Sequence, residues 1–281
     1  SIEIEIYGEG PTLLLPVNPH PIEGELAEQM RYYGADPALG QNLIQGLSDM
    51  VRVVAFDYEG HVMGKPRPAT LTPENVVKDF LTIADATGTD RFAYYGYSWL
   101  AMTGLQLAIR TNRLSALIMG GFPPLHGPYA EMLRVTAAAY EMAGSPPSPD
   151  DEWSGGGLTK DKTQQYVTLY QSLQDFDDET VQAQITCHRL SFVGSADEIQ
   201  YGKNWGDVLV SLAGPIIRGQ AELEALGWDV RVLDGLDHMG AMQAAQGIPE
   251  EQARILAIQG MLASDTAHYG DAVAAFAESR R

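Results

Sequence analysis

Residues 91–110, RFAYYGYSWLAMTGLQLAIR, decide the fold predicted for this chain. The first five of them are rich in β-forming side chains and predict a short strand. A turn at GYSW follows, and from Leu100 onward small and apolar residues recur at helical spacing. Ser98 therefore lies at a sharp strand-to-helix turn, with free N–H groups of the helix behind its hydroxyl group. This arrangement predicts a nucleophilic serine at the end of a strand.

The segments around this turn alternate between strand and helix. Besides the strand before Ser98, the alternation of Ile with Glu predicts a strand over 1–7, and apolar runs predict strands over 12–17, 51–56, 114–119, 187–193 and 228–233. Helices are expected over 27–47 with an interruption, over 73–86 and over 208–226, whereas 57–68 is expected to be a loop. The pattern predicts an α/β protein with a mostly parallel central sheet flanked by helices.

The alternation is interrupted between residues 123 and 185, where helical segments are separated by proline- and glycine-rich stretches. Such a long insertion between two sheet strands favours an inserted helical cap over the site, although ordinary surface helices would leave a similar pattern. We therefore predict a core domain made of residues 1–122 and 186–281 and a cap made of residues 123–185.

A serine hydroxyl group needs a base, and the base needs an acid that orients it. His238 follows the last predicted strand, and Asp197 follows the strand before it. Ser98, Asp197 and His238 thus all come at the carboxyl ends of predicted parallel strands, where open α/β sheets place their sites. Asp237 is the weaker candidate for the acid. The sequence predicts a Ser-His-Asp triad.

These residues resemble the catalytic set of the α/β-hydrolase superfamily. GYSWL resembles the nucleophile elbow G-x-S-x-G, with Leu100 in place of the second glycine, and the order Ser98, Asp197, His238 is the order of that superfamily. The resemblance implies the α/β-hydrolase fold with an inserted helical cap. It covers nearly the whole chain in element order, but its specific motifs cover only a few short segments.

The same resemblance implies an oxyanion hole. One donor is the backbone N–H of Trp99, the residue after the nucleophile. Haloalkane dehalogenases carry H-G-N-P in the loop that supplies the second donor, and this sequence reads PVNP, so Asn18 takes that role. Dehalogenases and epoxide hydrolases carry Asp where Ser98 stands, so serine favours acyl transfer to water. Proline iminopeptidases share Ser-Trp at the elbow, but their H-G-G-P-G is absent.

Composition excludes several classes of function. The formal net charge of −19, with only 18 Lys and Arg residues, argues against nucleic-acid binding. No apolar run is long enough to span a bilayer, and no signal peptide is recognisable, so we expect a cytoplasmic protein. The single cysteine, Cys187, excludes an internal disulfide. No metal-ligand spacing and no cofactor motif occurs, so no metal and no cofactor is expected.

The sequence thus predicts a serine hydrolase for an ester, lactone or related acyl compound. The expected substrate is a small molecule of moderate size with an apolar part. Two alternatives stay open: a non-hydrolytic enzyme of the same fold, catalysing acyl transfer, cyclisation or C–C cleavage, and a small-molecule receptor with a vestigial triad. A homodimer is open as well. The side chains expected to line the substrate site, although each of them could equally be core packing, are Phe122, Leu125, Tyr129, Met132 and Met239.

Overall fold

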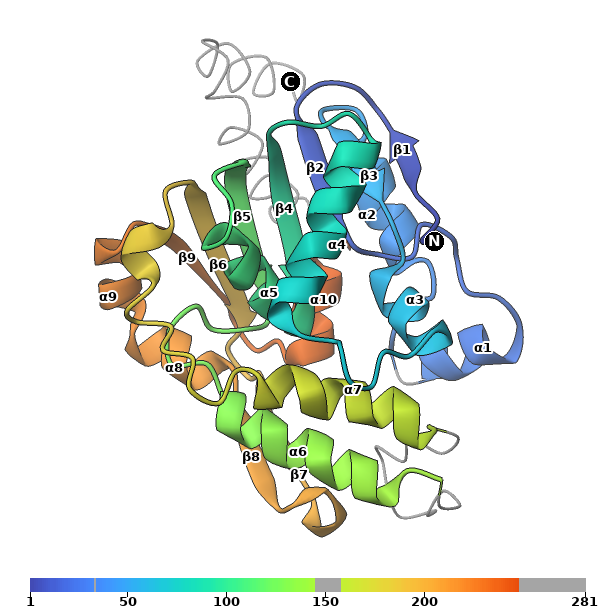
Figure 1. Cartoon of the computed structure of the whole chain (residues 1–281), viewed down its shortest axis with the longest axis vertical. Coiled ribbons are helices and arrows are strands. Elements are labelled where there is room, and N and C mark those ends of the chain that lie inside the picture. The colour runs from blue at the N-terminus through green and yellow to red at the C-terminus, as the bar shows by residue number, and fades with distance from the viewer. Residues whose placement is uncertain (33, 145–157, 248–281) are drawn as a thin grey trace.

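A seven-stranded sheet runs through the centre of the protein in the computed structural model (Figure 1), which describes residues 1–32, 34–144 and 158–247. The strand order is β1-β3-β2-β4-β5-β6-β9. All neighbouring strands are parallel except β1, which pairs antiparallel with β3. The strands are β1 (Glu5–Tyr7), β2 (Thr12–Leu15), β3 (Arg52–Ala55), β4 (Phe92–Tyr97), β5 (Leu114–Gly120), β6 (His188–Gly194) and β9 (Trp228–Leu233).

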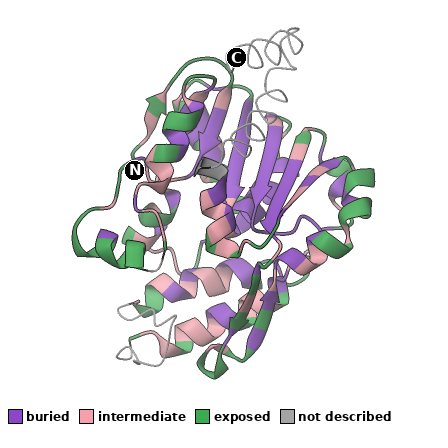
Figure 2. Cartoon of the chain, turned by 180° about the vertical axis from the view of Figure 1, so that it is seen from behind, coloured by how far each residue is buried: buried purple, intermediate pink, exposed green. Residues whose placement is uncertain are grey.

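The central strands are buried on both faces, which explains their nearly continuous apolar sequences (Figure 2). Successive side chains point to opposite faces of a sheet. Accordingly Leu14 and Tyr94 belong to one hydrophobic core, while Leu13, Leu15 and Tyr95 belong to a second one on the other face. The predicted α/β class with a mostly parallel sheet is confirmed.

Helices cover the two faces of the sheet. The first core contains α4 (Pro73–Ala86) and α5 (Trp99–Ala108), and the second contains α2 (Leu39–Leu47) and α10 (His238–Gly247). Helix α4 starts as its sequence predicts, because the Thr72 hydroxyl group accepts a hydrogen bond from the Asn75 N–H and Pro73 occupies the first turn. The layers are therefore helix, sheet, helix.

Two helices of the predicted cap, α6 (Tyr129–Met142) and α7 (Lys160–Gln171), pack side by side below the carboxyl ends of the strands in Figure 1. A short 3-10 helix, Gln182–Gln184, leads back to the sheet. The hairpin of β7 (Glu198–Tyr201) and β8 (Val208–Ser211), which includes the 3-10 turn Lys203–Trp205, also packs on α6. The predicted cap residues 145–157 and core residues 248–281 lie outside the described residues, and the division into two domains stays a prediction.

The hairpin corrects the helix predicted over 208–226. That segment forms β8 followed by two short helices, α8 (Ala213–Arg218) and α9 (Gln220–Ala225). The sequence VLVS at its start is apolar and β-branched, and it pairs with β7, so long-range strand pairing prevails over the helical spacing. Gly219 ends α8 and separates it from α9.

The loop predicted over 57–68 is also corrected, because its first part is the helix α3 (Tyr58–Gly64). The Asp57 carboxylate caps this helix by accepting a hydrogen bond from the Gly60 N–H at 2.8 Å. Two glycines in seven residues lower the helix propensity, which hides α3 from the sequence. Before it, the interrupted helix predicted over 27–47 is α1 (Gly24–Tyr32) followed by α2.

None of the helices in the described ranges has the length and apolar character that crossing a membrane requires.

Candidate active site

Ser98 lies between the end of β4 and the start of α5 in a conformation that L-residues rarely adopt. Its φ is 56° and its ψ is −129°. The Ser98 N–H donates a hydrogen bond to the carbonyl oxygen of Gly120 on the neighbouring strand at 2.8 Å, which holds the turn against the sheet. Backbone strain of this kind persists only where the surrounding structure enforces it, and it concentrates at functional sites.

The turn requires a glycine before the serine but none after it. A Cβ atom at Gly96 would lie 2.3 Å from the carbonyl oxygen of Leu100, so no side chain fits there. The side chain of Leu100 instead is 6% exposed and packs into the first core. The Leu100 carbonyl oxygen accepts hydrogen bonds from Tyr94 and Thr103, each at 2.8 Å. Leucine is therefore accommodated in place of the second glycine of the elbow pattern.

The structure brings Asp197 and His238 together. Nδ1 of His238 lies 2.8 Å from Oδ2 and 3.0 Å from Oδ1 of Asp197, whose side chain is fully buried. The two loops approach closely, because a Cβ atom at Gly194 would lie 2.1 Å from the carbonyl oxygen of Leu236. The side chain of His238 is 20% exposed, so one end of the imidazole ring is held by a buried carboxylate while the ring stays accessible.

Tyr97, the residue before Ser98, links the serine turn to the histidine loop. Its hydroxyl group donates a hydrogen bond to the carbonyl oxygen of His238 at 2.7 Å, and the two rings are 5.1 Å apart. Burial and the nearby charge of Asp197 raise the pKa of Tyr97, which keeps the hydroxyl group protonated as a donor. Sequence reasoning missed this contact, because 141 residues separate its partners.

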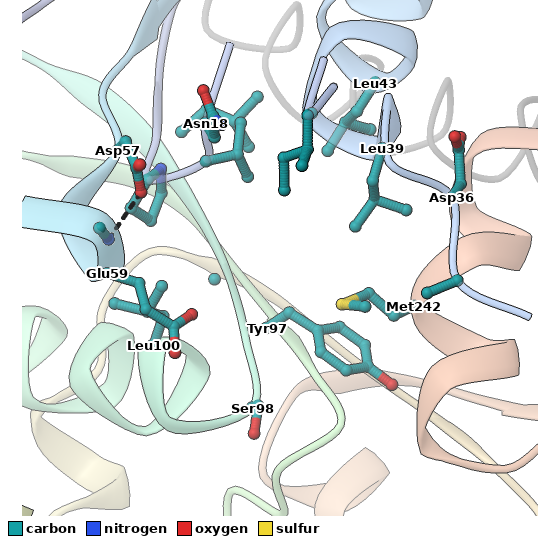
Figure 3. A pocket seen from close by; sticks show the side chains of 18 of the residues that line it. Asn18, Asp36, Leu39, Leu43, Asp57, Glu59, Tyr97, Ser98, Leu100 and Met242 are labelled. Carbon is teal, nitrogen blue, oxygen red and sulfur yellow. Dashed lines mark hydrogen bonds between the residues drawn. The ribbon is translucent and has the colours of Figure 1, made fainter. Parts of the chain in front are cut away.

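Ser98 and His238 both line one cavity of about 500 Å³, but among the described residues no hydrogen bond joins the serine hydroxyl group to the imidazole ring. The cavity walls come from the loop after β2, the segment from α1 to α2, the start of α3, the serine turn and the start of α10. Figure 3 shows the hydroxyl group of Ser98 pointing away from the aliphatic side chains of Leu39 and Leu43.

Solved structures with the same arrangement of elements are numerous. An esterase from Thermogutta terrifontis, bound to malate, has 16% sequence identity and a TM-score of 0.59, with 92% of this chain and 93% of that one covered. The chain has the α/β-hydrolase fold. An enol-lactonase from Burkholderia xenovorans is 17% identical with a TM-score of 0.53, covering 93% and 96%. AqDC, which recognises and ring-cleaves the Pseudomonas quinolone signal, is 13% identical with a TM-score of 0.58, covering 94% and 96%.

No protein-family model matches the sequence, and no curated protein matches it either. The α/β-hydrolase fold, which the sequence predicted from a few short motifs, is thus confirmed by similarity in three-dimensional structure.

Two backbone N–H groups in this α/β-hydrolase fold are free at the cavity. Neither the Asn18 N–H nor the Trp99 N–H donates a hydrogen bond to another described residue, and both residues line the cavity. The Asn18 side chain accepts a hydrogen bond from the His20 N–H at 3.0 Å, so its amide oxygen is engaged within its own loop. The backbone N–H of Asn18 therefore stays available as a donor where it was predicted.

Most of the side chains predicted to line the substrate site do not line the cavity that contains Ser98. Phe122, Leu125 and Tyr129 are 2%, 2% and 8% exposed in the first core, and Met132 is a partly buried neighbour of that core. Met239 alone of the five lines the cavity. The rings of Phe122 and Tyr129 lie 5.7 Å apart, so these two residues pack on each other within the core. Phe122, Leu125, Tyr129 and Met132 therefore occupy the core-packing positions that the sequence left open as the alternative.

A carboxyl group that sequence reasoning missed also lines the cavity. Glu59, near the start of α3, lines the cavity and is exposed to solvent. Burial raises the pKa of Glu59, the charge of Asp57 raises it further, and the proximity of Trp99 opposes the rise. The available signal was its place directly after β3, at the carboxyl end of the sheet.

Within the described ranges no three His, Cys, Asp or Glu side chains converge in a way that suits a metal ion.

Proposed function

We propose that the protein is a serine hydrolase of esters, lactones or related acyl compounds. The observation that carries the proposal is the contact between His238 and the buried Asp197, beside a serine held in a strained turn. The similarity in fold to esterases and an enol-lactonase supports a hydrolytic reaction.

In this proposal Ser98 Oγ attacks the carbonyl carbon of the substrate, and Nε2 of His238 accepts the serine proton. The Asp197 carboxylate accepts the hydrogen bond from Nδ1–H, fixes the tautomer and stabilises the imidazolium ion. His238 then returns the proton to the leaving alkoxide as the tetrahedral intermediate collapses to an acyl-enzyme. A water molecule, deprotonated by the same histidine, hydrolyses the acyl-enzyme and regenerates Ser98.

The negative charge that develops on the carbonyl oxygen needs donors that are already in place. The free N–H groups of Asn18 and Trp99 are the proposed donors, and the Trp99 N–H also lies at the N-terminus of α5, where the helix dipole favours negative charge. Because Asn18 turns its side-chain oxygen to His20, that oxygen does not oppose the oxyanion.

The cavity indicates the class of substrate. Its volume of about 500 Å³ fits a small molecule, and aliphatic residues such as Leu39, Leu43 and Met242 form much of its wall. A substrate of moderate size with an apolar part is therefore proposed. The cytoplasmic location and the homodimer stay predictions.

The test is covalent labelling by a fluorophosphonate probe, followed by mass spectrometry of the labelled peptide. We expect labelling at Ser98 that disappears in Ser98→Ala and His238→Ala. Ser195→Ala is the matched control, because Ser195 also follows a strand of the sheet but its hydroxyl group accepts a hydrogen bond from the Gly235 N–H. Folded protein that resists labelling, or label that persists in Ser98→Ala, would refute the proposed nucleophile.

A second candidate function is a reaction in which the serine does not attack. The similarity in fold to AqDC, which ring-cleaves the Pseudomonas quinolone signal, supports it. This candidate predicts no turnover of simple esters and no labelling of Ser98, together with a reaction that still requires His238.

A further inference from the structure

The loop that carries Asn18 has few backbone hydrogen bonds of its own. Three of residues 16–21 are prolines, which have no N–H group. The Val17 N–H donates a hydrogen bond to the Leu15 carbonyl oxygen at 2.9 Å, and the Asn18 N–H donates none to another described residue. The position of Asn18, and with it the proposed oxyanion donor, is therefore set largely by packing against other elements.

Helix α2 provides a close contact for this loop. A Cβ atom at Gly40, in the first turn of α2, would lie 2.0 Å from the carbonyl oxygen of Asn18 and 3.2 Å from Cγ2 of Val17. The Asn18 carbonyl group thus rests directly on the backbone of α2, and Figure 3 shows Asn18 and Leu43 of α2 at the same end of the cavity. Gly40 does not have a positive φ, so this contact, rather than the backbone conformation, requires glycine. A Cβ atom at Gly46 on the same helix would meet no atom within 4 Å.

The start of α2 is tied in turn to the helix that begins at His238. The side chain of Gln243 on α10 accepts a hydrogen bond from the Asp36 N–H and donates one to the Gly34 carbonyl oxygen, each at 2.8 Å. The Asp36 carboxylate accepts a further hydrogen bond from the Asn42 side chain of α2 at 2.7 Å. The buried faces of α2 and α10 also belong to the same hydrophobic core. The histidine and α2 are therefore held in one hydrogen-bonded frame.

We propose that Gly40 is a positioning residue for the oxyanion donor. Its missing side chain lets the Asn18 peptide group lie against α2, which fixes the direction of the Asn18 N–H at the cavity that also contains Ser98 and His238. Gln243 supports this arrangement by holding the start of α2 against the helix of His238. The inference rests on the proposed function and adds to it the residues that place one of the two oxyanion donors.

The physical reason is the rigidity of the peptide group. The two peptide planes of Asn18 meet at its Cα atom, so a displacement of the carbonyl group also moves the N–H. The atom that a Cβ at Gly40 would meet is a backbone atom, which cannot turn away as a flexible side chain can. A donor stabilises the oxyanion only when it is aimed at the developing charge, so a small displacement lowers the rate more than it weakens substrate binding.

The kinetic test uses Gly40→Ala and Gly46→Ala, which make the same substitution on one helix. Hydrolysis of ethyl butanoate is followed by titration of the released acid. Because loss of a whole oxyanion donor lowers kcat about 100–1,000-fold, we expect its displacement in Gly40→Ala to lower kcat about 10–100-fold, with KM changed less than about 3-fold. Gly46→Ala should keep the native kcat, because its added methyl group meets nothing. A folded Gly40→Ala protein with the native kcat would overturn the proposal.

A change of one substrate atom supplies a readout that general damage to the site does not alter. Ethyl thionobutanoate carries sulfur in place of the carbonyl oxygen, and sulfur accepts hydrogen bonds weakly. An intact oxyanion hole therefore favours the oxygen ester. We expect the ratio of kcat/KM for the oxygen ester to that for the thionoester to fall about 10-fold in Gly40→Ala and to stay native in Gly46→Ala. An equal loss on both esters in Gly40→Ala would overturn the assignment.

Gln243→Met tests the same frame without adding an atom near Asn18, and it replaces Gly40→Ala if the alanine variant does not fold. The substitution keeps the length of the side chain and removes both hydrogen bonds to residues 34 and 36. The ratio for the two esters should fall about 3-fold. Gln220→Met on α9, which removes a hydrogen bond to Glu224, is the control and should keep the native ratio. A native ratio in Gln243→Met would overturn the role given to this side chain.

Hydrogen exchange separates failure of this positioning from failure of the proposed function. Deuterium uptake by the peptide that contains residues 17–20 is measured by mass spectrometry in the native protein, Gly40→Ala and Gly46→Ala. Uptake should be faster only in Gly40→Ala, because a displaced loop releases the hydrogen bonds of the Val17 and His20 N–H groups. If the native protein hydrolyses no ester, the hydrolase proposal fails, and uptake alone decides whether Gly40 holds the loop. Equal uptake in all three proteins would show that it does not.

Discussion

Replacing Ser98 by glycine should stabilise the protein while it removes the nucleophile. At φ 56° and ψ −129°, Ser98 occupies a region that L-residues avoid at a cost of about 1–3 kcal/mol. Glycine adopts this conformation without strain. Its greater freedom in the unfolded chain offsets about 0.4–1 kcal/mol of that gain. The free energy of unfolding should therefore rise by about 1 kcal/mol, which corresponds to roughly 2–4 °C in the melting temperature.

Ser98→Ala is the matched comparison, because alanine also removes the hydroxyl group but keeps the Cβ atom that causes the strain. Urea-induced unfolding, followed by circular dichroism, and calorimetric melting measure both variants. Fluorophosphonate labelling checks that both have lost the nucleophile. The difference between the variants then reports the backbone strain alone, without the contribution of the lost hydroxyl group.

A second pair of variants controls for a general effect of glycine. Ser195 follows β6 and does not have a positive φ, so Ser195→Gly should be less stable than Ser195→Ala. The reversed order at Ser98 is the expected result. If Ser98→Gly is no more stable than Ser98→Ala, the strained turn and the argument built on it are wrong.

Three further predictions concern the residues around the serine. Replacing Asp197 by asparagine should lower kcat/KM about 10,000-fold. Asp237 is an exposed carboxylate that caps α10, so Asp237→Asn should change kcat/KM only a few-fold. Steady-state kinetics on one ester measures both variants. Tyr97→Phe removes the hydrogen bond to the His238 carbonyl oxygen and should lower kcat roughly 5–10-fold with little change in KM, measured on the same ester. Folding raises the pKa of the Glu59 carboxyl group. The contribution of this group to stability is therefore complete below its ordinary pKa and is lost as the pH rises through the higher pKa of the folded state. Urea unfolding at a series of pH values should show a flatter pH dependence of the free energy of unfolding for Glu59→Gln.

Local sequence patterns predicted the parts of the fold that local interactions determine. Strand β4, the turn at Ser98 and helix α5 follow from a β-rich run, a glycine and a helical repeat within twenty residues. Helix α4 was predicted from its capping threonine and its proline. The hairpin β7–β8 was missed, because its strands pair only with each other and β8 carries no signal beyond the three apolar residues Val208, Leu209 and Val210.

The composition of the cavity wall was the least predictable feature. Phe122 and Leu125 follow a strand end and are apolar, as a substrate wall would be, but apolar character also suits the core, where the structure places them. Glu59 lies in a helix that two glycines conceal, and its environment depends on Trp99, which is forty residues further along the chain.

The sequence alone thus determined the α/β class and a serine at the end of a strand, because hydrophobic periodicity and turn chemistry act over a few residues. It also placed Asp197 and His238 at the ends of later strands. Only the tertiary structure decided that their side chains meet at 2.8 Å and that Tyr97 holds the histidine loop. Such contacts depend on how the sheet twists and how its helices pack, which join residues that lie 41 and 141 positions apart.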